Sequence, residues 1–116
     1  MDLNQHGFQV QTNPAEIHGT LRVDLNHFRR IFDNLFSNVR KYADPAFPVT
    51  ISQSVDRDEL LITISNHINQ NQNRVESNRI GLQTCNKLAS AMGGEFNQSR
   101  TKETFTVEVL LPVYTE

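Results

Sequence analysis

One long stretch of the chain places its apolar residues with the period of an α-helix. Because they are spaced by one or three positions, they share one side of a helix. The set is Leu25, Phe28, Ile31, Phe32, Leu35, Phe36 and Val39. Asp24 is a suitable N-cap, since its carboxylate can accept hydrogen bonds from the unpaired amides of the first turn. The pair Asp44-Pro45 predicts the end of the helix, because a residue before proline disfavours helical geometry.

Alternating apolar positions on both sides of this helix predict strands. Two short extended pieces precede it, Phe8-Gln9-Val10 and Leu21-Arg22-Val23. Two alternating runs follow it, from Val49 to Val55 and from Leu60 to Ile64, and a polar turn at Asp56–Glu59 lies between them. This arrangement predicts a β-hairpin.

The last third of the chain predicts a second helix and two more strands. The helix spans Ile80 to Met92 and is stopped by Gly93-Gly94, because glycine adopts the left-handed conformation without steric cost. Phe96 begins a short strand, and residues 104–111 alternate strictly and form a strand that Pro112 ends.

A polar segment, residues 66–79, separates the hairpin from the second helix, and only Ile68 and Val75 could anchor it. We expect a mobile surface loop, and loops of this length are either functional or disordered. The order of elements is β-β-α-β-β-loop-α-β-β. It predicts an α+β fold, a two-layer sandwich with a mixed sheet and helices on one face.

Composition and charge narrow the classes of function. The chain has 116 residues, which suggests a single domain over 1–116. Its net charge of −2 argues against a nucleic-acid binder, which should be distinctly basic. The lone cysteine, Cys85, excludes an intramolecular disulfide, and it is most simply a small core residue. No apolar run approaches the ~20 residues of a membrane span, and no signal peptide follows Met1, so we expect a cytosolic domain, alone or cut from a larger protein.

Candidate chemistry lies along one edge of the first helix. At 100° per residue, Asn34, Asn38 and Lys41 fall within about 60° of one another beside the apolar stripe, and Tyr42 flanks them. A carboxamide oxygen is a hard, neutral ligand for Mg²⁺, and a lysine supplies a point charge for phosphate. The alternative interpretation of these residues is an ordinary solvated helix face.

The same helix resembles the N box of sensor histidine kinases, which reads roughly N-L-L-x-N-A-x-K-Y. The residues that match in register are Asn34, Leu35, Asn38, Lys41 and Tyr42. Gly81-Leu82 and Gly93-Gly94, at the two ends of the second helix, and the closing strand also fit the catalytic domain of that family. The resemblance covers about residues 20–113.

The resemblance implies the Bergerat ATP-binding sandwich, shared with gyrase- and Hsp90-type ATPases, and ATP and Mg²⁺ as cofactors. It implies that Asn38 is the magnesium ligand. Asn34, the candidate catalytic residue, would meet the metal's water or a phosphate, Lys41 would touch phosphate, and Tyr42 would lie against the nucleotide.

Two glycine-rich boxes of the family are altered here. The family pattern D-x-G-x-G, whose aspartate accepts from the adenine amino group, becomes Asn66 to Gln70, with asparagine in the first position and no glycine. An asparagine oxygen can still accept, and some kinases that resemble the peptide-quorum type also carry Asn there. In the second box, only Gly81 remains of the glycines; with Leu82 it would offer helix N-terminal amides to phosphate, or it is a close packing contact. Residues 67–79 take the place of the ATP lid.

The scattered histidines fit no metal-ligand spacing, and none is in a long helical hairpin such as carries the family's phosphoacceptor. These are His6, His18, His27 and His67. Our first hypothesis is the ATP-binding domain of a membrane-bound sensor kinase, lying in the cytoplasm. Its partners would be a helical dimerisation domain of the same parent, which carries the phosphoacceptor histidine, and a response regulator. The alternatives are a non-catalytic signalling module of the same fold, suggested by the lost glycines, and a serine kinase of the anti-sigma type.

Overall fold

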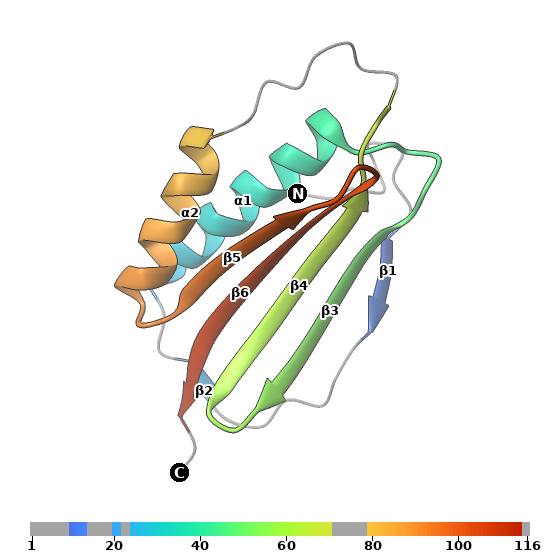
Figure 1. Cartoon of the computed structure of the whole chain (residues 1–116). Coiled ribbons are helices and arrows are strands. Elements are labelled where there is room, and N and C mark those ends of the chain that lie inside the picture. Colours follow the sequence, from blue (N-terminus) through green and yellow to red (C-terminus); the bar gives the residue numbers. More distant parts are fainter. Residues whose placement is uncertain (1–9, 14–19, 22–23, 71–78, 115–116) are drawn as a thin grey trace.

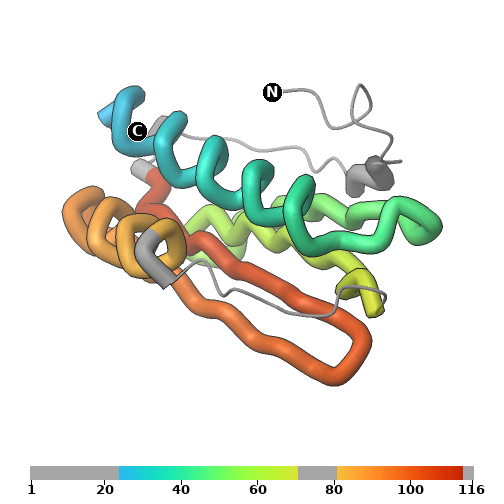
Figure 2. The backbone as a smooth tube through the Cα atoms, turned by 90° about the horizontal axis from the view of Figure 1, so that it is seen from above, coloured from blue at the N-terminus to red at the C-terminus, as the bar shows by residue number. Residues whose placement is uncertain are grey.

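The computed structural model describes residues 10–13, 20–21, 24–70 and 79–114. In chain order, its elements are β1 (Val10–Asn13), β2 (Thr20–Leu21), α1 (Leu25–Tyr42), β3 (Val49–Asp56), β4 (Glu59–His67), α2 (Arg79–Ala91), β5 (Glu95–Arg100) and β6 (Thr104–Tyr114). The strands form one sheet in the order β1-β3-β4-β6-β2, and β5 also pairs with β6. Both helices lie on the same side of this sheet (Figures 1 and 2).

The sheet is mixed, because β1 runs parallel to β3 while every other pairing among the described strands is antiparallel. The predicted two-layer α+β sandwich with helices on one face is therefore confirmed. Neither described helix has the length and apolar composition that crossing a membrane requires.

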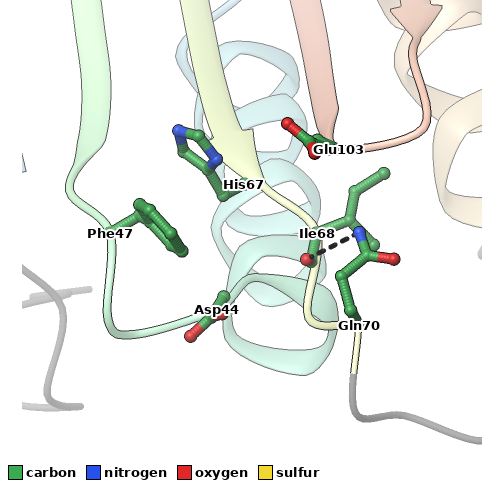
Figure 3. Close-up of a pocket in the computed structure, with 6 residues that line it drawn as sticks. All are labelled: Asp44, Phe47, His67, Ile68, Gln70 and Glu103. Atoms are coloured by element: carbon green, nitrogen blue, oxygen red, sulfur yellow. Dashed lines mark hydrogen bonds between the residues drawn. The ribbon is translucent and has the colours of Figure 1, made fainter.

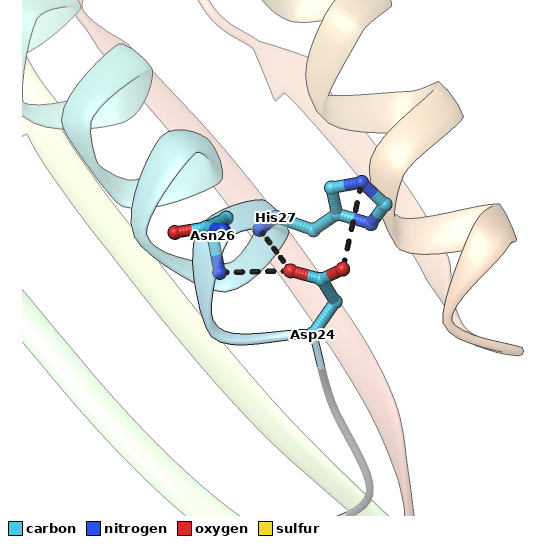
Figure 4. A network of polar contacts seen from close by, with 3 residues as sticks. All are labelled: Asp24, Asn26 and His27. Carbon is cyan, nitrogen blue, oxygen red and sulfur yellow. Dashed lines mark hydrogen bonds and ion pairs between the residues drawn. The ribbon is translucent and has the colours of Figure 1, made fainter.

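Helix α1 begins where the sequence predicts, because Asp24 caps it. One carboxylate oxygen of Asp24 accepts from the backbone amides of Asn26 at 2.9 Å and His27 at 3.2 Å (Figure 4). The other oxygen lies 4.0 Å from Nε2 of His27. The helix ends at Tyr42, and its last turn carries Arg40 and Lys41. Their positive charges interact favourably with the negative end of the helix dipole.

The core fills the space between the helices and the sheet. Residues of α1 three or four apart point at alternate residues of β4 and β6, as the two periodicities require. The buried residues of this core include Ile31, Leu35, Val39, Leu60, Ile64, Cys85, Ala89, Val107, Val109 and Leu111. These contacts fix α1 and the end of β4 relative to each other.

Two turns close the β3–β4 end of this core. The β3–β4 hairpin closes directly, since Asp56 pairs with Glu59, and Arg57 takes a positive φ of 58°. After α2, Gly93 has a φ of 79° and the amide of Gly94 donates to the carbonyl of Ala89 at 2.9 Å. The prediction that the glycine pair stops this helix is confirmed.

The sequence predicts that the last strand ends at Pro112, and this prediction is wrong, because β6 continues to Tyr114. Along one edge of β6, the pairing with β5 ends at Leu110 and the described pairing with β2 begins at Val113. Pro112, which has no N–H, lies between these two pairings. On the β4 side, the neighbouring amide of Val113 donates to the carbonyl of Asp58 at 2.7 Å. The proline therefore removes no hydrogen bond of the described ladder, which is where sheets tolerate it.

The sequence predicts a polar loop over 66–79, and both predicted bounds of this loop are wrong. Strand β4 continues through Asn66 and His67, which pair with Phe105 and Thr104, and Ile68 then forms a bridge with Ala43. Helix α2 includes Arg79, one residue earlier than predicted. The rest of the loop, 71–78, lies outside the described residues, as do His6, His18, residues 8–9 of the first predicted strand and residues 22–23 of the second.

Candidate nucleotide-binding site

The four predicted residues of α1 differ in how far they are buried. Asn38 is only 8% exposed, although it is polar. Asn34, one turn earlier, and Tyr42 are half-buried, while Lys41 is exposed. The solvated-face interpretation is therefore wrong for Asn38, because a residue of a wet helix face is not enclosed by the protein.

Asn38 is also a buried polar group for which the described residues supply no partner. Within the described part of the chain, its carboxamide makes no side-chain hydrogen bond. A buried amide left unsatisfied costs roughly 1–3 kcal/mol of stability, so native proteins rarely keep one without a reason. A neutral oxygen donor in a protected place fits the hard cation Mg²⁺, and the chain's own residues thus suit the metal that the resemblance implies.

Asn66 is the second buried polar residue among those described, and it is 5% exposed. Side chains alternate along β4, so Asn66 faces the helices together with Ile64 and Ile68. Its Nδ2 donates to the carbonyl of His67 at 3.1 Å. This hydrogen bond uses the donor end of the carboxamide and leaves Oδ1 as an acceptor on the helix side of the sheet.

The ends of α1 and β4 are joined by backbone hydrogen bonds. The amide of Asn69 donates to the carbonyl of Tyr42 at 2.9 Å, and the amide of Asp44 donates to the carbonyl of His67 at 2.8 Å. The structure thus brings the N-box end of α1 and Asn66 to the same end of the molecule.

Asn34 contacts the second helix. Its side chain interacts with the thiol of Cys85, and this thiol donates to the carbonyl of Ile31 over 3.6 Å. Burial raises the pKa of Cys85 to about 11 and outweighs Asn34, which lowers this pKa, so the thiol is neutral at physiological pH. Cys85 is a core residue, as predicted, but its contact with Asn34 was missed, because it depends on how α1 and α2 pack together.

Gly81 and Leu82 fall in the first turn of α2, where the sequence places them. Gly81 is buried and Leu82 is half-buried against the core. The first turn of a helix presents backbone N–H groups along its axis, and the helix dipole makes this end attractive to anions. In Figure 1 this end of α2 lies at the same end of the sandwich as the end of α1.

Metal chemistry based on charged or imidazole ligands has no support in the described residues, which hold no group of three or more His, Cys, Asp or Glu side chains that could bind a metal. The contribution of His67 to the site could not be predicted from the sequence. His67 contributes its backbone carbonyl to the site. Every residue has such a carbonyl, so the residue type does not reveal this role.

Comparison with known proteins agrees with this geometry. Residues 23–115 match the sequence profile described as "Histidine kinase-, DNA gyrase B-, and HSP90-like ATPase". The chain is 33% identical over 95 residues to sensor histidine kinase YrkQ of Bacillus subtilis. The match covers 82% of this chain but only 22% of YrkQ, so the chain spans about a fifth of that relative's length.

Solved structures show the same fold. Histidine kinase AdeS of Acinetobacter baumannii superposes with a TM-score of 0.76 at 14% identity, over 97% of this chain and 58% of that one. The catalytic domain of histidine kinase ThkA gives a TM-score of 0.76 at 12% identity, over 98% of this chain and 85% of the other. These comparisons give no support to the non-catalytic alternative. By the profile match over most of its length, the chain belongs to the family of histidine kinase-, DNA gyrase B- and HSP90-like ATPases.

Proposed function

We propose that this chain works as the ATP-binding catalytic domain of a two-component sensor histidine kinase, over residues 1–116 as one domain. The observation that carries the proposal is the buried carboxamide of Asn38, which makes no side-chain hydrogen bond to the described residues, at the same end of the sandwich as the buried acceptor of Asn66. The γ-phosphate of ATP would go to a histidine on a helical dimerisation domain outside this chain.

The α1 residues would form the phosphate side of the site. Asn38 would hold Mg²⁺ through its carboxamide oxygen, and the metal would neutralise the charge of the phosphates. Asn34, held by Cys85, would meet the metal's water or a phosphate oxygen. Lys41 would contribute a point charge for phosphate at the exposed end of the helix, and Tyr42 would lie against the nucleotide.

The base and the remaining phosphates would contact other elements. Asn66 would accept from the amino group of adenine, because its Nδ2 is already bound to the carbonyl of His67 and its oxygen is left for the ligand. The backbone amides of Gly81 and Leu82 would face phosphate oxygens at the start of α2. Phosphoryl transfer needs positioning and charge neutralisation more than a nucleophile of this chain. The domain alone is therefore not expected to phosphorylate itself.

The parent protein would supply the other partners. We infer a membrane-bound sensor whose catalytic domain lies in the cytoplasm, together with a response regulator that receives the phosphoryl group. The support is the 33% identity to a sensor histidine kinase. No nucleic-acid partner is proposed, since the net charge is −2.

Calorimetric titration with a non-hydrolysable ATP analogue, with and without Mg²⁺, tests the proposal. We expect saturable binding that Mg²⁺ strengthens, and an Asn38→Ala variant that loses about tenfold or more in affinity only when Mg²⁺ is present. Asn86→Ala is the matched control, because Asn86 is an exposed asparagine on α2. The absence of binding at millimolar nucleotide, or equal losses in both variants, would contradict the proposed site.

A further inference from the structure

One phenylalanine lies directly beside the buried carboxamide of Asn66. In the β4–β6 ladder, Asn66 is the partner of Phe105, and directly opposite residues on antiparallel strands have Cβ atoms about 4.5–5.5 Å apart. Such partners share one face of the sheet, so Phe105 faces the helices together with Asn66. The side chain of Phe105 is half-buried and packs against the core. The candidate base contact therefore has an aromatic neighbour on its β6 side.

The neighbours of Asn66 along its own strand are apolar as well. Ile64 and Ile68, two positions before and after it, share its face of the sheet and are only 2% and 7% exposed. Ile68 is also held by its backbone, because its carbonyl accepts from Nε2 of Gln70 at 3.2 Å (Figure 3). Together with Phe105, these two isoleucines form an apolar frame around the carboxamide.

The orientation of the Asn66 carboxamide is fixed by a hydrogen bond. Its Nδ2 donates to the carbonyl of His67 at 3.1 Å, and the amide of Asp44 donates to the same carbonyl at 2.8 Å. Turning the carboxamide over would place its oxygen against this carbonyl, so that two acceptors would face each other. Oδ1 receives no hydrogen bond from the described residues, and it therefore needs a donor from a ligand or from water.

The surroundings of this acceptor decide which base can pair with it. In an open site, water would satisfy Oδ1 whenever the ligand offers no donor. An acceptor enclosed by apolar groups stays unpaired instead, and sites of this kind reject analogues that lack the donor by large factors. Adenine has an amino group at carbon 6, whereas hypoxanthine has a carbonyl oxygen there, so these two bases differ at the group that would meet Oδ1.

We propose that Phe105 is a specificity-determining residue, which excludes water from the acceptor of Asn66 and so restricts the site to bases with an amino group at carbon 6. This inference rests on the proposed function, in which Asn66 contacts the base. Phe105 has neither a donor nor an acceptor in its side chain. It acts through the hydrogen bond that Asn66 makes, by controlling the access of water to it.

Calorimetric titration of the chain with ATP and with inosine triphosphate, both in the presence of Mg²⁺, tests this proposal. We expect the chain to bind ATP about a hundredfold or more tightly than inosine triphosphate. In Phe105→Ala, water can reach Oδ1, so this preference should fall about tenfold, mainly because inosine triphosphate binds more tightly. A role of Phe105 in stacking on the base would instead weaken both nucleotides by the same factor.

Two further variants separate this role from a general effect on the fold. Phe105→Leu keeps an apolar side chain beside Asn66 and should retain the preference for ATP. Phe105→Thr introduces a smaller, polar residue that still favours a strand, and it should lose the preference as Phe105→Ala does. Thermal unfolding of each variant measures any change in the stability of the fold.

Phe47→Ala is the matched control. Phe47 stacks on the ring of His67 beside a small cavity, with the ring centroids 4.2 Å apart (Figure 3). Because His67 follows Asn66 in the strand, its side chain faces the opposite side of the sheet, so the loss of the Phe47 ring should leave the preference for ATP unchanged.

Three results would overturn the proposal: no preference for ATP in the unchanged chain, an unchanged preference in both Phe105→Ala and Phe105→Thr, or an equal fall in Phe47→Ala. A chain that binds neither nucleotide contradicts the proposed function, and this inference with it. A chain that binds ATP and inosine triphosphate alike contradicts only the role of Phe105.

Discussion

The two ends of the sandwich are built from the same two layers, yet they are filled differently. Near the β3–β4 turn, the buried side chains between the layers are apolar, with Leu60, Leu111 and Val113 among them. At the opposite end, α1 and β4 each contribute a buried carboxamide, Asn38 and Asn66. Among the described residues, these two are the buried polar side chains, and both lie at the same end.

This difference separates the residues that stabilise the fold from the residues that are available to bind a ligand. Apolar contacts at the β3–β4 end stabilise the domain. A buried carboxamide that finds no partner among the described residues, such as that of Asn38, lowers its stability. Departures of this kind from ordinary core packing are expected at functional sites. Changes at the apolar end should therefore alter stability, and changes at the carboxamide end should alter binding.

The largest expected loss of stability comes from Gly94→Ala, at the apolar end. A Cβ on Gly94 would collide with the backbone carbonyl of Leu110, which cannot move without disturbing β6. We expect the free energy of unfolding to fall by about 3 kcal/mol in urea denaturation. Gly93→Ala is the control: it meets only Pro112, at 3.5 Å, and should lose about 1 kcal/mol through its positive φ. Equal losses would show that the close approach at Gly94 does not matter.

Cys85, between the two ends, should make stability depend on alkaline pH. Burial raises its pKa from 9.0 to about 11, so the folded state keeps a proton that the unfolded chain releases. The stabilisation is complete below about pH 9 and declines as the pH rises towards 11, by a total of about 2–3 kcal/mol. Urea midpoints measured from pH 8 to 11 should show this decline, and Cys85→Ala should show less of it. An identical slope in the variant would assign the decline to other groups.

Asn38→Leu should separate stability from binding at the carboxamide end. Leucine has the same branching as asparagine and removes the amide, which finds no partner among the described residues. The free energy of unfolding should therefore rise by about 1 kcal/mol, while the magnesium-dependent affinity for nucleotide should fall. Thermal unfolding and calorimetry on one sample measure both quantities. Leu35 is an apolar core residue about one turn earlier on α1. Leu35→Ala therefore serves as the opposite control, and its free energy of unfolding should fall by about 2–5 kcal/mol. A large loss of stability in Asn38→Leu would remove the distinction between the two ends.

The smallest effect is expected at the helix cap. Asp24→Ala removes the side-chain acceptor of two first-turn amides and should cost about 1 kcal/mol of stability. Because Asp24 lies at the start of α1, far along the helix from Asn38, nucleotide affinity should not change. Asp24→Asn should retain most of the stability, since an amide oxygen also caps helices. A drop in affinity beyond twofold would mean that the two ends are coupled.

Local sequence patterns predicted the parts of this fold that local physics decides. The spacing from Leu25 to Val39 and the capping carboxylate of Asp24 are enough to place α1, and strict alternation is enough to place most of β6. The burial of Asn38 could be expected only through the N-box resemblance, because an asparagine beside an apolar stripe is equally compatible with solvent.

The errors arose where distant pairing decides the structure. Asn66 and His67 have a polar character typical of a loop, yet they belong to β4 because Phe105 and Thr104 continue the ladder beside them. Pro112 has the character of a strand end, yet it falls where β6 needs no donor. The same holds for the contact between Asn34 and Cys85, which joins residues 51 positions apart in sequence, and for the cavity at Phe47.

The carboxamide of Asn66 has one more consequence. A carboxylate in its position would gain a proton in acid and become a donor, whereas an amide neither gains nor loses one at any pH at which proteins stay folded. With Nδ2 committed to the carbonyl of His67, the group facing the helices is an acceptor at every such pH. The Asn66 side of any contact with a bound molecule is therefore unchanged by acidification, up to the point at which the domain itself unfolds.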